Sequence, residues 1–358
     1  MRYNGDNEKI NKERHMLNRQ WLLKCRPEDK MKPSDFEYRE IELDGNNLQP
    51  GEALVCNRMF AMAPTMRNAL NNAKDSYGFS VDIGDTVKGL NVCEVVKSRN
   101  ADWPEGSRFT ALSGWEDYAI VDLTTPSPFL SRLNQDTEPA DALGLCGGNA
   151  MSAYVGLLKV GDPKPGETLV VSAAAGSVGS VAAQIGKIKG CKVIGIAGGP
   201  QKCQWLVDEL QLDAAIDYKT DNVRESLAAQ CPNGVNLFFD NVGGDILQAV
   251  VDNIAYHGRI VVCGQVSAYD SDATAPGPRD MMKIVYWSVR MQGFLLSDFP
   301  EEFEHAQQDL LQWGKEGKIK HYEDIRDGFA NLPSTFMDLF SGANTGTLML
   351  NNDLPGMR

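Results

Sequence analysis

The sequence predicts an α/β protein of two parts, in which a doubly wound parallel sheet is joined to a separate β-rich domain. The chain has 358 residues, which is enough for two domains. From residue 143 to residue 314, predicted strands alternate with predicted helices, an order typical of a parallel sheet with helices on both faces. Between residues 19 and 121, short predicted strands are separated by glycines, which indicates a compact β domain or a partly open barrel.

The N-terminal third supplies the predicted β domain. The alternating segment Phe36–Leu43 predicts a strand, and Pro50-Gly51 predicts a turn before the next one. Residues 62–69 predict a loop that enters a short helix, and residues 126–139 form a polar, proline-bearing connector. The strands predicted here are 19–24, 36–43, 53–60, 92–96 and 115–121.

The stretch 169–199 organises the second part. Its apolar start, Leu169 to Val171, predicts a buried strand, and residues 192–197 predict a second strand. The helix between them has one apolar face, made of Val178, Val181, Ala182, Ile185 and Ile188. A strand–helix–strand unit of parallel strands requires a right-handed crossover.

The turn between this strand and this helix has the spacing of a dinucleotide-binding turn, with Ala174 in the first glycine position. Gly176 lets the backbone approach a pyrophosphate, and Gly179 lets helix and strand pack closely. The helix N-terminus adds unpaired N–H groups and positive dipole. Because strand, turn, helix and second strand are all present, we predict a nucleotide site of the Rossmann type; the alternative is a tight turn in another α/β protein.

The end of the second strand indicates which nucleotide binds. An NAD site usually has an acidic residue there for the ribose 2′-hydroxyl, whereas this chain has Gly198-Gly199 and then Lys202. Two glycines leave room for a 2′-phosphate and Lys202 supplies a cation, so we expect NADPH. A solvated lysine on the first turn of a helix is the alternative.

After residue 199, predicted helices and strands continue to alternate. Helices are predicted at 201–210, 222–230, 245–255, 281–288 and 300–314, and strands at 214–218, 235–240, 259–263 and 291–296. The tail returns to strand (319–325), helix (332–340) and strand (347–350), and these elements could complete the first domain.

Composition excludes several functions. Hydrophobic residues make up 42% of the chain, which is adequate for packed cores, and the net charge of −13 disfavours binding to nucleic acid or anionic membranes. No apolar run approaches the roughly 18 residues of a transmembrane helix. The first 15 residues are polar and lack an apolar signal core, so we interpret residues 1–15 as a flexible arm on a cytoplasmic protein.

Metal chemistry is not expected. The eight cysteines include no C-x-x-C pair, and the four histidines have no ligand spacing. We therefore interpret the cysteines as small buried hydrophobic residues in a reducing compartment, without disulfides or metal.

Several separate motifs, in one order, resemble a known family, the zinc-independent medium-chain reductases of the leukotriene-B4 dehydrogenase and prostaglandin-reductase type. Within it, the likeness is greatest to microbial NADPH-dependent curcumin reductases. The matching segments are 18–27, 154–180, 185–202, 238–244, 258–270, 275–280 and 341–350.

This resemblance implies a GroES-like catalytic domain made of both chain ends, residues 16–143 and 322–358, with a Rossmann domain, residues 144–321, inserted between them. It implies reduction by NADPH of the carbon–carbon double bond of a small-molecule α,β-unsaturated carbonyl. It also implies a homodimer, commonly joined through the cofactor domains.

The resemblance further implies functional residues. The family's phosphate-binding lysine corresponds to Lys202, its tyrosine near the ribose phosphate to Tyr218, and a residue that reaches across from the other domain to Asn344. Asn241 faces the cofactor at its strand end. The full set of expected cofactor-binding residues is Ser152, Ala174, Gly176, Ser177, Val178, Gly179, Gly198, Lys202, Tyr218, Asn241, Cys263, Gly264, Gln265, Ser267, Tyr269, Phe294, Leu295, Leu296 and Asn344.

Besides Lys202 and Tyr269, three of these residues have structural alternatives. Asn241 precedes Val-Gly-Gly and is compatible with a simple turn. Tyr218 is compatible with an exposed edge tyrosine, and Asn344 with a helix cap.

Tyr269 is the expected catalytic residue. It lies just beyond the predicted strand 259–263, and loops at the carboxyl ends of parallel strands face the ligand crevice. The family resemblance places a functional tyrosine in this serine-x-tyrosine stretch. Its phenol can donate a hydrogen bond to a developing enolate or hold the nicotinamide ribose hydroxyl. An aromatic ring packed at the base of a loop is the alternative.

The chain departs from the family pattern at several places. Residues 62–67 (MAPTMR) lack the aspartate and the tyrosine usual in this entrance segment, and 147–151 (GGNAM) differ from the usual M-P-G pattern. Ser152 stands where threonine is usual, and Gly346-Thr347 where Gly-Lys is usual. These changes leave the natural substrate open.

We therefore expect hydride transfer to the β-carbon of an enone, with the protein supplying orientation and stabilising the carbonyl oxygen. Because the same fold hosts other reactions, an NADP-dependent alcohol dehydrogenase, a quinone reductase and a non-catalytic NADPH-binding protein are the alternatives.

Overall fold

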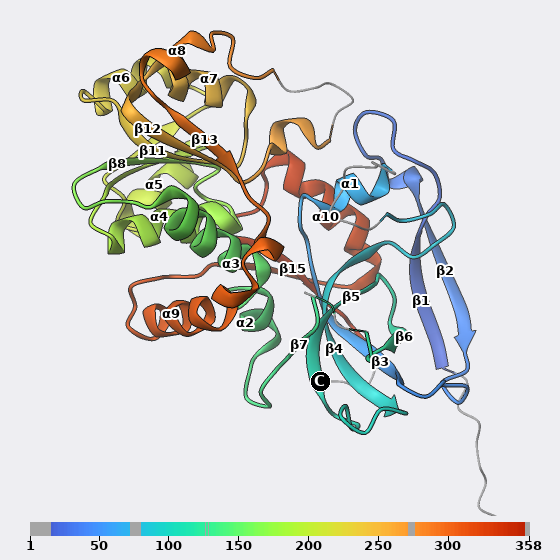
Figure 1. Cartoon of the computed structure of the whole chain (residues 1–358). Helices are drawn as coiled ribbons and strands as arrows, with labels where there is room; N and C mark the ends of the chain where they lie inside the picture. The colour runs from blue at the N-terminus through green and yellow to red at the C-terminus, as the bar shows by residue number, and fades with distance from the viewer. Residues whose placement is uncertain (1–15, 72–79, 126, 128, 271–275, 355–358) are drawn as a thin grey trace, which may run out of the picture.

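The computed structural model describes residues 16–71, 80–125, 127, 129–270 and 276–354. The predicted arm, residues 1–15, lies outside the described residues. Figure 1 shows two parts: a parallel sheet with its helices, coloured green to orange, and a β-rich part in which red C-terminal segments lie against blue N-terminal ones.

The parallel sheet has six strands in the order β10-β9-β8-β11-β12-β13. All neighbouring pairs are parallel. Numbered from the first strand of the unit, this is the order 3-2-1-4-5-6 of a Rossmann fold, which places the ligand crevice between β8 and β11, where the order reverses. The strands are β8 (Thr168–Ser172), β9 (Lys192–Ala197), β10 (Ala214–Asp217), β11 (Val235–Asp240), β12 (Ile254–Val262) and β13 (Arg290–Gly293).

Helices cover both faces of this sheet, because its central strands are apolar on both sides. Leu169 and Val171 of β8 pack with α3, α4 and α9 in one buried cluster. Val170, between them in sequence, packs with α6 and α7 in a second cluster. Successive strand residues point to opposite faces, so one strand contributes to both cores. These helices are α3 (Gly148–Val155), α4 (Ser177–Ile188), α5 (Pro200–Asp208), α6 (Val223–Gln230), α7 (Gly244–Asp252), α8 (Met282–Tyr286) and α9 (Phe303–Lys315), and α3 continues as a π-helix over Gly156–Gly161.

The β-rich part combines both ends of the chain. Its main sheet has the order β14-β15-β3-β4-β5-β7, with β6 paired to β3, and β1 and β2 form a separate antiparallel pair. The two C-terminal strands join the sheet through β15, which pairs with β3. The strands are β1 (Met16–Leu23), β2 (Phe36–Leu43), β3 (Glu52–Ala61), β4 (Lys88–Ser98), β5 (Arg108–Gly114), β6 (Tyr118–Asp122), β7 (Ser131–Arg132), β14 (Glu323–Asp327) and β15 (Thr347–Asn351), and the helices are α1 (Met66–Leu70), α2 (Pro139–Leu143) and α10 (Leu332–Ser341).

The predicted α/β class with its Rossmann sheet and β-rich domain is confirmed, and several element limits are corrected. Strand β5 is absent from the prediction, and it forms because Arg108–Gly114 pairs along the whole of its length with β4. The helix predicted to reach residue 255 ends at Asp252, because Ile254 begins the buried strand β12. The strand predicted at 319–325 lies instead at 323–327, where it pairs with β15.

The domain limits 144 and 321 remain our proposal. In the part of the chain that the structure describes, no helix is long and apolar enough to cross a membrane.

Candidate functional site

The predicted dinucleotide turn follows β8 directly. Ala173 has a left-handed backbone (φ 48°), which is unusual for a residue with a side chain, and the turn closes when the Gly176 N–H donates to the Ala173 carbonyl at 2.9 Å. A Cβ atom on Gly179 would lie 2.2 Å from that same carbonyl oxygen. Residue 179 must therefore be glycine for helix α4 to pack this closely against the turn.

Helix α4 presents its N-terminus at this turn. Gly176 is the N-cap residue, and no side chain among the described residues caps it. The first N–H groups of the helix are therefore available for an anion, and the helix dipole favours negative charge there. Asn149 of α3 donates to the Ser177 hydroxyl at 3.0 Å and fixes that side chain beside the site. The predicted pyrophosphate turn thus has the required shape.

The residues expected at the 2′-phosphate lie together at the ends of β9 and β10. The ring of Tyr218 covers Gly198, since a Cβ atom at residue 198 would lie 2.8 Å from that ring. Lys202, in the first turns of α5, is half-buried, and burial lowers the pKa of its ammonium group. Lys219 adds to that shift and Asp324 opposes it, so a second cation and an acidic side chain both act on Lys202.

Two residues near this group were missed by sequence reasoning. Asp217, at the end of β10, accepts hydrogen bonds from the N–H groups of Gly199 (2.8 Å) and Lys219 (3.0 Å). These backbone donors hold the pKa of the Asp217 carboxyl below its usual range. Asp217 therefore holds the turn in shape, and these two backbone N–H groups stabilise its negative charge. The sequence did offer one indication of Lys219, because it directly follows Tyr218.

The chain tail crosses the cofactor turn. The Gly346 N–H donates to the Ala175 carbonyl at 2.8 Å, and the Lys202 ammonium donates to the Gly342 carbonyl at 2.9 Å. Asn344 is buried here, and its amide donates to the Gly346 carbonyl at 3.1 Å. The Asn344 amide nitrogen is thus bonded within the tail itself. A contact between Asn344 and the cofactor stays a prediction.

The carboxyl ends of β8 and β11 are joined by side chains. The Asn241 side-chain amide donates to the Ser172 carbonyl at 2.7 Å, and the Asn241 N–H donates to the Ser172 hydroxyl at 2.8 Å. That hydroxyl donates to Asp240 at 2.9 Å, and burial raises the pKa of the Asp240 carboxyl. Asn241 is therefore held at the switch point of the sheet, where a ligand crevice is expected.

The loop after β12 also passes the carboxyl ends of β8 and β11. The N–H groups of Cys263 and Gly264 both donate to the Asp240 carbonyl, at 2.8 and 3.1 Å. The phenol oxygen of Tyr269 accepts from the Gln265 N–H at 3.2 Å, which folds the tyrosine back over the loop. A Cβ atom on Gly264 would lie 3.3 Å from that phenol oxygen. Tyr269 thus lies at the carboxyl end of β12 beside Asn241.

Burial controls the protonation of this loop. It raises the pKa of the Tyr269 phenol above its ordinary value and raises the pKa of the Cys263 thiol to about 12. Both groups are therefore neutral near pH 7, so the phenol keeps its proton for donation. Ser267, which is exposed, donates its hydroxyl to the Val242 carbonyl at 2.6 Å.

The remaining predicted residues lie after β13 and on α3. Phe294 packs against Gly156, where an added Cβ would lie 2.4 Å from the ring, and Leu296 packs on the same core cluster. Leu295 is exposed. The Ser152 hydroxyl donates to the Gly148 carbonyl of its own helix at 2.8 Å, so the structure gives Ser152 a helix-internal partner.

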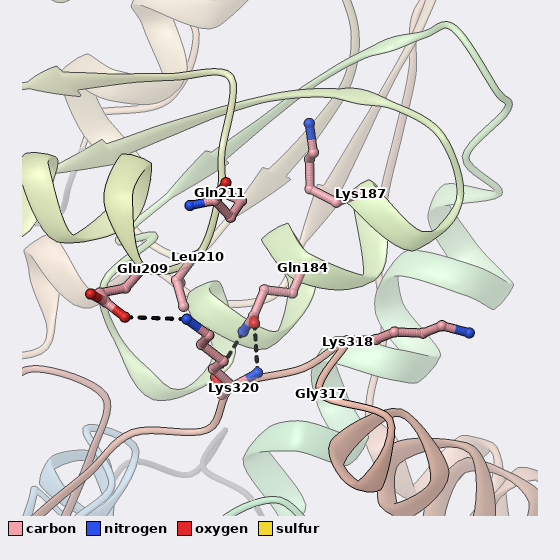
Figure 2. A pocket seen from close by; sticks show the side chains of 8 residues that line it. All are labelled: Gln184, Lys187, Glu209, Leu210, Gln211, Gly317, Lys318 and Lys320. Carbon is pink, nitrogen blue, oxygen red and sulfur yellow. Dashed lines mark hydrogen bonds and ion pairs between the residues drawn. The ribbon is translucent and has the colours of Figure 1, made fainter.

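Figure 2 shows a small pocket on another face, at the far half of α4. Its lysines are paired with acidic side chains. Figure 2 shows Lys320 with Glu209, at 3.2 Å. Lys187 pairs with Asp213 at 2.8 Å and Lys318 with Glu316 at 2.7 Å. The Gln184 amide bonds the backbone of residue 320 through both of its polar atoms. Because its charged groups already have partners, this pocket is no rival to the turn as a cofactor site.

The fold and this site define a dinucleotide-binding protein with a Rossmann sheet and a separate β-rich part. Among the described residues, no group of three or more His, Cys, Asp or Glu side chains is placed to hold a metal ion. Residues 19–128 match the family described as the N-terminal domain of oxidoreductase, and residues 177–312 match the family described as zinc-binding dehydrogenase.

Relatives and solved structures narrow this class. The chain is 37% identical to the NADPH-dependent curcumin reductase of Escherichia coli (strain K12), over 93% of this chain and 96% of the relative. It is 36% identical to prostaglandin reductase 1 of Oryctolagus cuniculus, over 91% of each chain. The structure of CurA from Vibrio vulnificus in complex with NADPH is 37% identical, with a TM-score of 0.87 over 94% of this chain and 100% of that one. The chain belongs to the medium-chain dehydrogenase/reductase family, in the group that includes curcumin and prostaglandin reductases.

Proposed function

We propose that this protein is an NADPH-dependent reductase of the carbon–carbon double bond of small α,β-unsaturated carbonyls. The observation that carries the proposal is the phenol of Tyr269, held at the carboxyl end of β12 beside the switch point of a dinucleotide-binding sheet. Relatives over nearly the whole chain support it, since they include a curcumin reductase, prostaglandin reductases and a 2-alkenal reductase of Nicotiana tabacum, 32% identical over 92% of this chain.

The chain's own residues fit a bound NADPH. At Gly179 an added Cβ would meet the backbone of the turn, so glycine is needed for α4 to pack there, and at Gly176 the lack of a side chain lets a pyrophosphate approach the backbone. We propose that Lys202, Lys219 and Tyr218 contact the 2′-phosphate, because Tyr218 covers Gly198 and the charge of Lys219 acts on Lys202. Two cations at one place favour a phosphate over a ribose hydroxyl.

The other site residues serve the reacting end. When bound, the reduced nicotinamide supplies the hydride for the β-carbon of the substrate. Asn241 and the loop from Cys263 to Ser267 orient the nicotinamide ring against the substrate. Tyr269 donates its phenol proton in a hydrogen bond to the carbonyl oxygen, or to the ribose hydroxyl that faces it, as negative charge develops there. Solvent then protonates the α-carbon.

A substrate panel tests this assignment against its alternatives. We expect NADPH oxidation with an enone and none with the corresponding saturated ketone. Oxidation with the saturated ketone would indicate an alcohol dehydrogenase, and oxidation with a quinone alone would indicate a quinone reductase. Absence of turnover across a broad enone panel would indicate a non-catalytic NADPH-binding protein.

We also propose that the protein is a homodimer joined through the cofactor domains. Among the residues that the structure describes, strand β13 is the edge of the parallel sheet and is exposed along its whole length, so its outer edge can pair with another strand. Large exposed apolar side chains gather beside it, and they are Met281, Met282, Val285, Tyr286, Trp287 and Met291. Light scattering of the purified protein should give twice the mass of one chain, and a monomer would contradict the proposal.

We further propose a cytoplasmic location. All eight cysteines are free thiols, and five of them are buried or partly buried beside apolar residues of the cores. Free thiols persist in a reducing compartment.

A further inference from the structure

A buried ion pair connects the entrance segment of the β-rich part to the loop that bears Tyr269. Arg67 of α1 is fully buried, and its Nε atom lies 3.2 Å from the carboxylate of Asp270, which is 16% exposed. A guanidinium without a counter-charge is costly in such surroundings, so this pair holds its two segments together wherever the fold is intact.

The pair is part of a wider set of contacts. The same Asp270 oxygen accepts from the Met31 N–H at 2.9 Å. Arg67 donates through a second nitrogen to the Asp29 carbonyl at 2.7 Å, and through a third to the side chain of Asn71. The arginine therefore joins three segments: the loop 29–31, helix α1 and the loop after β12.

The position of this connection relative to Tyr269 is the decisive feature. Asp270 follows Tyr269 directly, and the Tyr269 phenol folds back to the Gln265 N–H. A short 3-10 helix, Val266–Ala268, lies between them. The loop is thus fixed at its start by β12 and at its end by Arg67, with the phenol between these two points.

We propose that Arg67 and Asp270 are positioning residues that set the place of the Tyr269 phenol against the substrate entrance. This inference rests on the proposed function. Asp270 acts through the backbone of the loop, and Arg67 acts through Asp270. The pair also joins the two parts of the chain close to the place of reaction, so it fixes their separation there.

Variants of Asp270 test the proposal in the full-length protein. Asp270→Ala removes the acceptor, whereas Asp270→Asn keeps an oxygen for Arg67 and Met31. In single-turnover reduction of an enone we expect Asp270→Ala to lower the rate about tenfold, with NADPH affinity changed less than about twofold, and Asp270→Asn to restore most of the rate. Arg67→Lys, which keeps the charge and loses the fork, should give the same loss if Asp270→Ala does not fold.

A double variant separates positioning from general destabilisation. In a Tyr269→Phe background, Asp270→Ala should lower the rate by less than about twofold further, because the hydroxyl that it positions is already gone. The matched control is Asp117→Ala, which breaks another interior ion pair, with Arg19 at 2.9 Å, away from this loop. Losses that multiply in the double variant, or an equal loss of rate in Asp117→Ala, would overturn the proposal.

Hydrogen exchange gives a readout that needs no substrate. The Gln265 amide donates to the Tyr269 phenol oxygen, so Asp270→Ala should speed its exchange while Asp117→Ala leaves it unchanged. If the wild-type protein reduces no enone, the proposed function fails, and this measurement still decides the role of the ion pair. Unchanged protection of residues 265–269 in Asp270→Ala would overturn it.

Discussion

Lys202 is the residue on which we expect the choice between NADPH and NADH to depend most. Its ammonium group bonds the tail at the Gly342 carbonyl, the charge of Lys219 acts on it, and the ring of Tyr218 covers the nearby strand end at Gly198. Lys202 was predicted from the sequence because it follows a recognisable strand end, whereas Tyr218 was predicted from the family resemblance. Lys219 and the pairing with Gly342 were not, because they depend on how segments far apart in the chain meet.

Replacement of this lysine should separate the two nicotinamide cofactors. Lys202→Ala removes a charge-assisted phosphate contact worth about 1.5–3 kcal/mol, so NADPH affinity should fall about ten- to a hundredfold while NADH affinity stays nearly unchanged. Titration calorimetry with both cofactors measures this. An equal loss for both would show that Lys202 does not contact the 2′-phosphate.

The hydroxyl of Tyr269 should matter for chemistry and little for binding. Tyr269→Phe keeps the ring, so kcat should fall about 10- to 1000-fold with NADPH affinity little changed. An unchanged kcat, where hydride transfer limits the rate, would leave Tyr269 as a packing residue.

The protonation of Tyr269 also predicts a pH profile. Burial raises the pKa of the phenol above its ordinary value, and the donating form is the protonated one. The contribution of this hydroxyl is therefore fully present below the ordinary phenol pKa and is lost only as pH rises through the higher, folded-state value. The wild-type to Tyr269→Phe rate ratio should be constant from neutral to mildly alkaline pH. A ratio that already falls near pH 7 would contradict this.

Helices and strands whose pattern lies within their own residues were predictable from the sequence. The strand–turn–helix–strand unit around residues 169–199 is as expected, because its apolar periodicities and its glycines are local. Strand β5 was missed, since its formation depends on pairing with β4 across the sheet. The Arg67–Asp270 pair was likewise out of reach, because 203 positions separate its partners.

The packing of α4 against its turn gives a prediction at the scale of the element. Gly179→Ala places a methyl group 2.2 Å from the Ala173 oxygen, so backbone must move, at a cost of about 1–3 kcal/mol, and NADPH binding should weaken with it. Gly148→Ala is the matched control, because nothing lies within 4 Å of the added atom. Thermal unfolding with and without NADPH compares the two. Equal stability of both variants would contradict the close packing.

The whole molecule is built from a sheet in the middle of the chain and a second sheet made from both ends. The class and order of these parts were predictable from alternation of strands and helices and from the family resemblance. Before the structure, only the family expectation for Asn344 indicated that the tail crosses the cofactor turn. The structure added the backbone contact between Gly346 and Ala175.

Excision of the cofactor part tests the proposed domain limits. A fragment of roughly Leu143 to Lys320 contains all six strands of the parallel sheet and should fold and bind NADPH. Binding should be weaker than in the full chain, because the tail from 342 to 346 is missing. A fragment that stays unfolded and gains no stability from NADPH would contradict the limits.

The central claim is that hydride passes from NADPH to the β-carbon of an enone, and isotope labelling tests it most directly. The full-length protein is given NADPH deuterated at nicotinamide C4 and an enone, and the product is examined by NMR. The account predicts deuterium at the β-carbon and a saturated ketone, with the α-hydrogen drawn from solvent. Deuterium on the carbonyl carbon, with an alcohol as the product, would contradict it.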